Sequence, residues 1–459
     1  MVAIHHIIDR VVFYGLLVTI AVTAIPYGAV QTWWVALFEC LVFILAIVAI
    51  IDLLITKDGL PPGASTALPL VILCMFLLFQ SLPLFAANNP VISDLRLSIS
   101  ADPFTTQLLS IKLFAFILAG VMLLRYTNSK RRLRILVYVL IGISVASALL
   151  GLVRQSTGGP AWFFPLPRLD RGFAQFVNRN HFGFLIEITF GLAIGFALRG
   201  ARGFQRWLLV SLAAFLWITL IVVNSRGAIL ASLCQLLLLA ILFNPFRLRV
   251  REDSASRATG FIKGFAVQAV LMILLISAFA FGVRWVGGEQ VASNLELTTS
   301  GFSEQGGHEH RENVSRRDIW RATWNLIKSH PIIGSGFGAY WIAITKYHDA
   351  SGRFTPQEAH NDYLELLAGG GLIGMGLVGW FVFRFLKATR KVFQDRPSSV
   401  SGIAIGAFVG IFGVAVHSVV EFGIHITING LLLTTAIAIP LVAVQLGSKN
   451  TLAPALLEE

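Results

Sequence analysis

The stretch WWVALFECLVFILAIVAIIDLLI, residues 33–55, decides the class of fold. Its only two charged side chains are Glu39 and Asp52. A helix of about 20 apolar residues spans the hydrocarbon core of a bilayer. Backbone polar groups in lipid must be satisfied within the segment, so this stretch predicts a transmembrane helix and not a strand.

The rest of the chain has the same character. It has 459 residues, 56% of them hydrophobic and only 13% charged, which is about half the charged fraction of soluble proteins. About twelve runs are long and apolar enough to span a bilayer: 11–25, 33–55, 67–86, 107–124, 135–153, 182–198, 207–223, 227–243, 264–283, 366–383, 402–420 and 427–446. The first run lacks a small-residue cleavage site and is expected to be a retained helix. The sequence therefore predicts an all-α polytopic integral membrane protein with about 12 transmembrane helices, and it excludes an ordinary soluble domain.

Lysines and arginines in short loops predict the orientation. Basic residues gather in 125–134, 199–206, 244–263 and 384–396, which alternate correctly to share one side, the cytoplasm. Both termini fall on that side. The net charge of +12 is then largely a topology signal, and charges split among short loops do not favour nucleic-acid binding.

These assignments give four parts. Residues 1–284 hold transmembrane helices 1–9, and 285–365 form a large helical periplasmic loop. Residues 366–447 hold helices 10–12, and 448–459 form a cytoplasmic tail. The three cysteines, Cys40, Cys74 and Cys234, lie in predicted spans without metal-finger spacing and are expected to be buried hydrophobes.

The long outer loop contains two readable segments. RRDIWRATWNLIKSHP, residues 316–331, places apolar side chains on one helical stripe flanked by basic residues, so it predicts an amphipathic helix at the membrane interface. Gly334, Gly336 and Gly338 form a GxGxG run that follows no strand. Tight backbone turning beside a helix explains this run better than nucleotide binding does.

The outer face carries many arginines, against the positive-inside bias. They are Arg154, Arg168, Arg171, Arg179, Arg226, Arg284, Arg311, Arg316, Arg317, Arg321 and Arg353. Guanidinium groups suit phosphate, because their planar fork donates two hydrogen bonds at once. Arg226 follows so short a connection that it must lie at or just inside the bilayer, where a charge usually has a functional partner. Snorkelling to the interface is the bland alternative.

Two polar clusters open or close predicted spans. In FVNRNHFGFLIEI, residues 176–188, Arg179, Asn180 and His181 begin a span, and Glu187 lies inside it. In HSVVEFGIH, His417, Glu421 and His425 are spaced to share one row of a helix. One helix rarely supplies a complete tetrahedral shell, so a polar cavity lining is expected rather than a metal site. The sequence predicts no metal ligands and no cofactor.

The stretch AHNDYLELLAGGGLIG, residues 359–374, places His360 where the outer loop re-enters the membrane. A histidine near neutral pH can act as a general base. With the arginines it suggests displacement of a pyrophosphate leaving group from a lipid-linked donor by a sugar hydroxyl. Asp362 and Glu365 point away from His360 on a helix, so an orienting acid is expected from elsewhere, either Glu421 or Glu187.

These residues resemble the O-antigen ligase and polymerase superfamily of bacterial envelope glycosyltransferases. The family's outer-loop motif is matched by His360, Asn361, Gly371 and Gly374, and a second motif, Arg-x3-Leu, by Arg226 and Leu230. RDIW, HPIIGSGFGAYW, NRNH and HSVVEFGIH are also similar to superfamily patterns, so the resemblance covers about 176–430. Many relatives carry a glutamate where this chain has Gly369.

The resemblance implies a metal-independent, inverting reaction in the bacterial inner membrane, with the active site in the periplasm. The donor would be a glycan on undecaprenyl pyrophosphate, and the acceptor a sugar of the lipid A core. His360 would be the general base, and Arg226 would bind pyrophosphate with Arg317 or Arg179. Asn180, His181, Asn361, His417 and Glu421 complete the expected substrate-binding residues.

Two alternatives stay open. A polymerase would use the same donor but extend a second undecaprenyl-linked glycan, and the motifs occur in both groups. A transporter of lipid-linked sugars would use the arginines without needing a base. The ionisable residues crowd the outer ends of the spans rather than their middle, which favours surface chemistry over transport.

Overall fold

The computed structural model describes residues 2–25, 28–86, 96–157, 172–243, 257–287, 316–348, 356–394 and 397–452. This part of the chain is helical, apart from two antiparallel two-residue strands, β1 (Phe85–Ala86) and β2 (Arg96–Leu97). The helices are α1 (Val2–Ala24), α2 (Thr32–Thr56), α3 (Leu68–Ser81), α4 (Pro103–Tyr126), α5 (Lys130–Thr157), α6 (Arg179–Arg199), α7 (Gly203–Val223), α8 (Arg226–Leu242), α10 (Arg257–Gly287), α11 (Arg316–Ser329), α12 (Tyr340–Ala343), α13 (Asp362–Thr389), α14 (Ser399–His417) and α15 (Thr427–Leu452).

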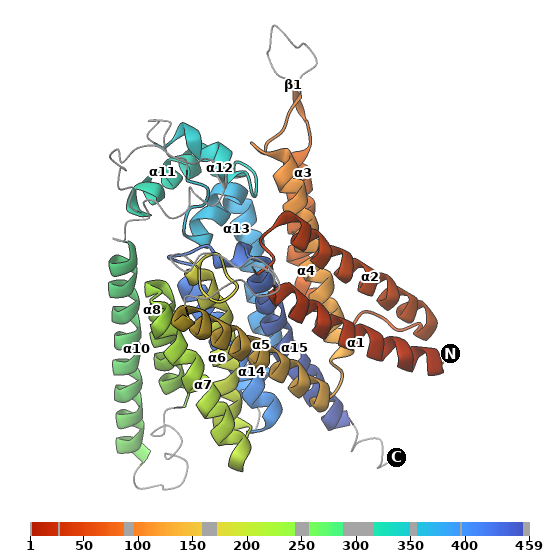
Figure 1. Cartoon of the computed structure of the whole chain (residues 1–459), viewed down its shortest axis with the longest axis vertical. Helices are drawn as coiled ribbons and strands as arrows, with labels where there is room; N and C mark the ends of the chain where they lie inside the picture. The colour runs from red at the N-terminus through yellow and green to blue at the C-terminus, as the bar shows by residue number, and fades with distance from the viewer. Residues whose placement is uncertain are drawn as a thin grey trace.

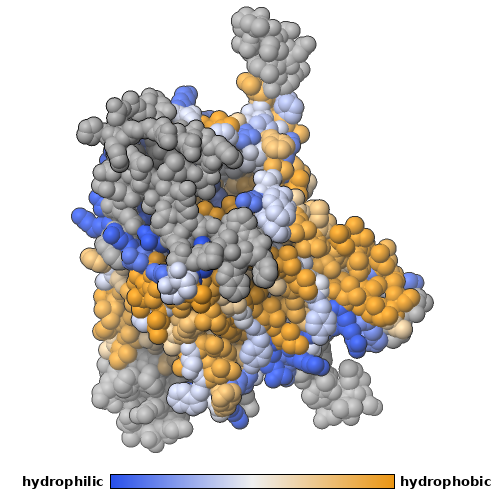
Figure 2. Space-filling model, viewed as in Figure 1, coloured by the Kyte–Doolittle hydropathy of each residue, from blue (hydrophilic) through white to orange (hydrophobic). Residues whose placement is uncertain are grey.

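Each of the twelve predicted apolar runs overlaps one of these helices, and the runs 67–86 and 402–420 extend past the ends of α3 and α14. Within the described residues, ten helices are long and apolar enough to cross a membrane, by length and composition. The other two runs are shorter apolar segments, Arg226–Leu242 and Ala266–Ala278. An all-helical membrane protein is therefore confirmed, while the count of twelve spans stays a prediction. Figure 2 shows hydrophobic side chains over the flank of the molecule, with hydrophilic ones both below and above them.

Helices α6 and α14 form the centre of the bundle. In the most apolar stretch of α6, 89% of the residues are buried inside the protein, whereas the share for α2 is 22%. Glycines let the two backbones touch, since a Cβ on Gly191 would lie 2.7 Å from the carbonyl oxygen of Gly406. Small residues at such a contact are the usual means by which membrane helices approach closely. The polar residues at the outer ends of α6 and α14 are thereby fixed against each other.

The outer segment, residues 316–348 with 356–361, lies at one end of the bundle, with α11 and α12 above the start of α13 (Figure 1). The apolar stripe of α11 was expected at the membrane interface. Instead, Ile319, Leu326 and Ile327 are buried inside the protein, and the last two pack in one cluster with Tyr340 and Ala368. The stripe therefore docks the outer segment onto α13, because an apolar face is buried by whichever apolar surface adjoins it.

The GxGxG run turns the chain tightly beside α13, as expected. Gly334, Gly336 and Gly338 all have positive φ, and Gly336 N–H donates to the Gly369 carbonyl at 3.0 Å. Gly371 interrupts α13 with φ 59° and ψ −160°, and a Cβ there would lie 2.7 Å from Gly334 N. Only glycine adopts this conformation at such close approach. The glycines after His360 thus seat the outer segment on the membrane helix.

Candidate active site

His360 lies at the end of the outer segment, two residues before α13 begins. Its backbone has φ 49°, an uncommon conformation for a residue with a side chain. The neighbours hold it there: Trp320 Nε1 donates to the Ala359 carbonyl at 3.0 Å, and Asp362 N–H donates to the Ser418 carbonyl at 2.9 Å. His360 is only 4% exposed. Non-glycine residues held in this region often belong to functional sites.

Glu421 orients the His360 ring. The Nδ1 of His360 lies 2.8 Å from Glu421 Oε1, and the carboxylate is 1% exposed. Of the two acids named from the sequence, Glu421 is the partner; Asp362 and Glu365 do not bond to His360 in the described residues. A carboxylate at Nδ1 keeps the ring proton on that nitrogen, which leaves the lone pair on Nε2.

The other oxygen of Glu421 connects two more helices to the site. Asn180 Nδ2 donates to Oε2 at 2.6 Å, and Arg316 donates to it through one guanidinium nitrogen at 2.9 Å. Burial alone would raise the pKa of Glu421, but the contacts with the His360 ring and with the Arg316 guanidinium hold that pKa below its usual range. Glu421 is therefore a fixed anion behind the imidazole.

Arg316 was not among the site residues expected from the sequence, which favoured Arg317. Arg316 is buried against Glu421, whereas Arg317 is exposed on α11. The signal was present in the sequence: Arg316 is three, four and seven residues before Ile319, Trp320 and Thr323, on the buried stripe. Arg317 is one position around the helix and faces outward.

The segment after α14, residues 417–421, is contacted by the first two residues of four helices. The contacts come from Asn180 of α6, Gly227 of α8, Arg316 of α11 and Asp362 of α13. A Cβ on Gly227 would lie 2.6 Å from His417 Nε2, so the start of α8 abuts this segment. Helix N-termini carry partial positive charge and exposed N–H groups, which suit anions.

Arg226 and Arg179 each open one of those helices. Arg226 follows the cap residue Ser225 of α8, and Arg179 follows the cap residue Asn178 of α6; both arginines are half-buried. Asn361 caps α13 in the same way, because its side chain accepts from the N–H groups of Tyr363 and Leu364. The Asn361 side-chain oxygen is thus the N-cap of the helix that follows His360.

His417, Glu421 and His425 do not share a helical row, so that expectation is wrong. Helix α14 ends at His417, and the chain turns before His425. His417 Nδ1 lies 2.7 Å from Glu187 Oε1 in a second, fully buried pair, so the acid inside α6 has a histidine partner. His181 and His360 both make edge contacts with Phe422, at 4.8 and 4.9 Å between ring centroids. The cluster is a polar lining built from several segments.

The remaining outer arginines are buried elsewhere, exposed, or outside the described residues. Arg154 is buried and donates to the Ala174 carbonyl, so it holds the α5–α6 connection. Arg284 and Arg321 are exposed. Arg168, Arg171, Arg311 and Arg353 lie outside the described residues.

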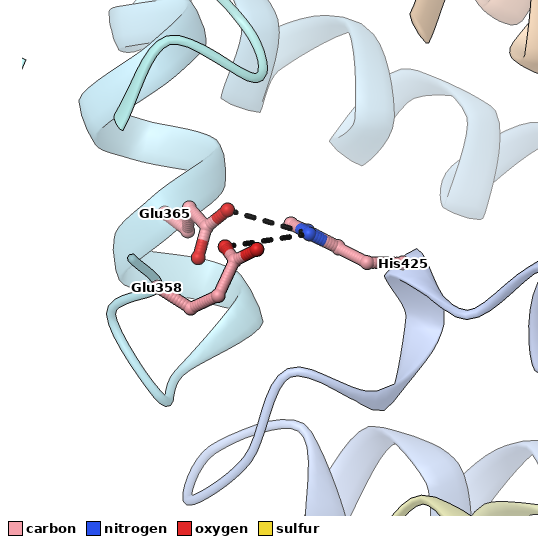
Figure 3. A group of neighbouring side chains, drawn as sticks. All are labelled: Glu358, Glu365 and His425. Carbon is pink, nitrogen blue, oxygen red and sulfur yellow. Dashed lines mark ion pairs between the residues drawn. The ribbon is translucent and has the colours of Figure 1, made fainter. Parts of the chain in front are cut away.

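One group in the described residues has metal-ligand character: Glu358, Glu365 and His425, with ligand atoms within 4.8 Å of one another. It shares only His425 with the row considered from the sequence. Figure 3 shows both carboxylates directed at the His425 ring, one from the start of α13 and one from the chain just before it.

Comparison with known proteins gives one match. Residues 210–379 match the family model described as O-antigen ligase, which spans 170 of the 459 residues. The matched region includes α8 with Arg226, α11 with Arg316, and His360. No curated protein matches the chain.

Proposed function

We propose that this chain moves a glycan from undecaprenyl pyrophosphate to a sugar hydroxyl of the lipid A core, and the match of residues 210–379 to the O-antigen ligase family model supports this. A ligase- or polymerase-type glycosyltransferase is the activity that the family match supports. The observation that carries the proposal within this chain is the buried His360–Glu421 pair, 2.8 Å apart, backed by Arg316.

In this reaction, the acceptor hydroxyl oxygen attacks the anomeric carbon of the donor sugar. The bond from that carbon to the pyrophosphate oxygen breaks, and undecaprenyl pyrophosphate leaves with the electron pair. The hydroxyl proton passes to Nε2 of His360, while Glu421 stabilises the imidazolium at Nδ1. A single displacement inverts the anomeric centre and needs no metal ion and no cofactor.

Positive charge must meet the leaving group, because one further negative charge develops on a pyrophosphate that is already anionic. Arg226 and Arg179 are the first residues of α8 and α6, at helix N-termini that favour anions. Arg317, exposed one position from Arg316, remains a third candidate. The proposed substrate region around His360 and Glu421 also includes His181, Asn180, Asn361 and His417.

The proposed location is the bacterial inner membrane, with the site on the periplasmic side and both termini in the cytoplasm. The support is an asymmetry of the fold. The basic turn after α4 and the end of α13 lie at the end of the bundle opposite α11 and α12 (Figure 1). Basic loops stay in the cytoplasm, so His360 would face the periplasm and meet donors held in the outer leaflet.

The test uses purified full-length protein in lipid nanodiscs with an undecaprenyl-pyrophosphate-linked glycan. Lipid A core and a second lipid-linked glycan are supplied in separate reactions. The expected result is free undecaprenyl pyrophosphate together with glycan joined to lipid A core. Transfer only to the second lipid-linked glycan would replace the ligase with the polymerase alternative, and donor movement without bond formation would support a transporter.

Two variants test the roles. His360→Gln should lower kcat by about 10²- to 10⁴-fold, while His330→Gln, an exposed histidine of the same outer segment, should leave it unchanged. Arg226→Ala should weaken donor binding by about 10-fold or more, since a hydrogen bond to a charged group contributes about 1.5–3 kcal/mol. Full turnover by His360→Gln would refute the general-base proposal.

A further inference from the structure

The cluster of Glu358, Glu365 and His425 lies beside the His360 site but takes no part in the transfer proposed above. Glu358 comes from the chain before α13, Glu365 from the first turns of α13, and His425 from the turn between α14 and α15 (Figure 3). The Nδ1 of His425 lies 3.4 Å from Glu365 Oε1 and 3.6 Å from Glu358 Oε2. Three separate segments therefore meet through ionisable groups.

These separations are longer than hydrogen bonds, which for N–H···O centre on about 2.9 Å. They match the edge of a coordination tetrahedron: ligand atoms about 2.1 Å from a zinc ion are about 3.4 Å from one another. The three ligand atoms lie within 4.8 Å of one another, close enough for one ion to reach them all.

Asp362 provides an independent observation on the other side of the same ring. Its side chain is 9% exposed, and Oδ1 lies 3.6 Å from His425 Nε2. Within the described residues neither of its oxygens has a hydrogen bond of normal geometry, although the Ser418 hydroxyl and the Ile424 backbone interact weakly with the carboxylate. A histidine that binds a metal through one nitrogen commonly donates the other N–H to a carboxylate, which fixes the ring. Asp362 occupies the position of such a carboxylate, beside Nε2 of His425.

The carboxylates around His425 also outnumber the positive charges beside them. Three carboxylates surround the His425 ring, and one ammonium, Lys112, donates to the His425 backbone carbonyl at 3.2 Å. Lys112 interacts electrostatically with both Glu39 and Glu358, so its single charge is shared between them. Negative charges gathered in a buried place are costly unless a cation compensates them.

We propose that Glu358, Glu365 and Nδ1 of His425 bind a divalent transition-metal ion of the zinc type, with Asp362 orienting the histidine. The mixed set of one imidazole and two carboxylates favours zinc or manganese over magnesium or calcium, which prefer oxygen alone. The side chains of His425 and Glu358 are 35% and 27% exposed, so the ion can enter from solvent and keep a water as its fourth ligand.

The ion's role is structural. Glu358 and Asp362 flank His360 two residues away on either side, and His425 follows Glu421 by four residues. An ion joining these segments holds the two halves of the His360–Glu421 pair at their distance. Only this last step rests on the proposed function; the binding site itself does not.

The test measures binding without either substrate. Chelator-stripped full-length protein in nanodiscs is titrated with Zn²⁺ against a competing indicator, and with Co²⁺ for the absorption bands of a tetrahedral site. We expect one ion per chain. Glu365→Gln and His425→Gln should each weaken binding by at least about 10-fold, and Asp362→Asn by about 10- to 100-fold.

The matched controls are Asp318→Asn and His330→Gln, two exposed residues of the outer segment, which should bind as the unaltered protein does. Each variant is first checked for the thermal midpoint of the stripped protein, so that misfolding is not counted as lost binding. Zinc binding that is absent, or unchanged in His425→Gln, would overturn the proposal. An enzyme that transfers glycan but binds no zinc refutes only the ion site, and one that binds zinc but transfers nothing refutes only the proposed function.

Discussion

Glu421 lies 2.8 Å from His360 although 61 residues separate them in the chain. His360 belongs to the start of α13, and Glu421 to the connection between α14 and α15. The same carboxylate is bonded to α6 through Asn180 and to α11 through Arg316. The anion behind the proposed base is therefore fixed from three directions.

Replacing Glu421 with glutamine should lower kcat by roughly 100-fold or more, because the neutral amide neither fixes the ring proton nor stabilises the imidazolium. Donor KM should change much less, since the pyrophosphate ligands remain. Steady-state kinetics with lipid A core as acceptor measure both constants. A fall in donor affinity with an unchanged kcat would contradict a positioning role for Glu421.

Arg316 and Arg317 form a natural matched pair. Arg316→Gln should lower both turnover and the thermal midpoint, because it leaves the buried Glu421 with less compensating charge. Arg317→Gln, on the exposed side of α11, should leave the midpoint unchanged and have a smaller effect on turnover. If the Arg317 variant loses more donor affinity than the Arg316 variant, Arg317 is the pyrophosphate ligand.

Gly191 tests the central helix pair. Gly191→Ala should destabilise the protein by about 1–3 kcal/mol, because the added Cβ would lie 2.7 Å from the Gly406 carbonyl oxygen and force α6 from α14. Gly376→Ala in α13 is the control, since nothing lies within 4 Å of its added Cβ. Thermal unfolding followed by scanning fluorimetry in detergent distinguishes them. Equal midpoints for the two variants would argue against tight α6–α14 packing.

Stability should fall with acid through Glu421. The pKa of Glu421 is lower in the folded protein than its unfolded value of about 4.3. A depressed carboxyl pKa stabilises the fold fully above the unfolded value and loses that contribution as the pH falls toward the folded value. The midpoint difference between the unaltered protein and Glu421→Gln should therefore be largest above about pH 5 and shrink below it. A difference that stays constant from pH 7 to pH 4 would contradict this sign.

The sequence predicts the helices well because lipid imposes one simple requirement, a long apolar run. Every predicted run overlaps a helix in the structure, although the runs 67–86 and 402–420 continue past the ends of α3 and α14. His360 could be singled out from the sequence, and helical geometry removed Asp362 and Glu365 as its partners, but the choice between Glu421 and Glu187 needed the structure. What local sequence could not show is where a helix ends: α14 stops at His417, and this sends His417, Glu421 and His425 to three different partners.

Long-range pairing explains the remaining differences. The pairing of Glu187 with His417 depends on how α6 packs against α14, which no local pattern records. Likewise, the apolar stripe of α11 predicts a buried face, but whether lipid or α13 covers it depends on the turn at 334–338. The spacing of that stripe does predict that Arg316 is buried and Arg317 exposed.

The seam between the outer segment and the bundle runs through the His360–Glu421 pair, with one partner on each side. If the outer segment lifts from α13 and from the 417–421 connection, the imidazole loses its carboxylate at the same moment. We therefore expect docking of this segment and readiness of the base to be one event. Such a coupling would protect the activated donor from water whenever the outer segment is open.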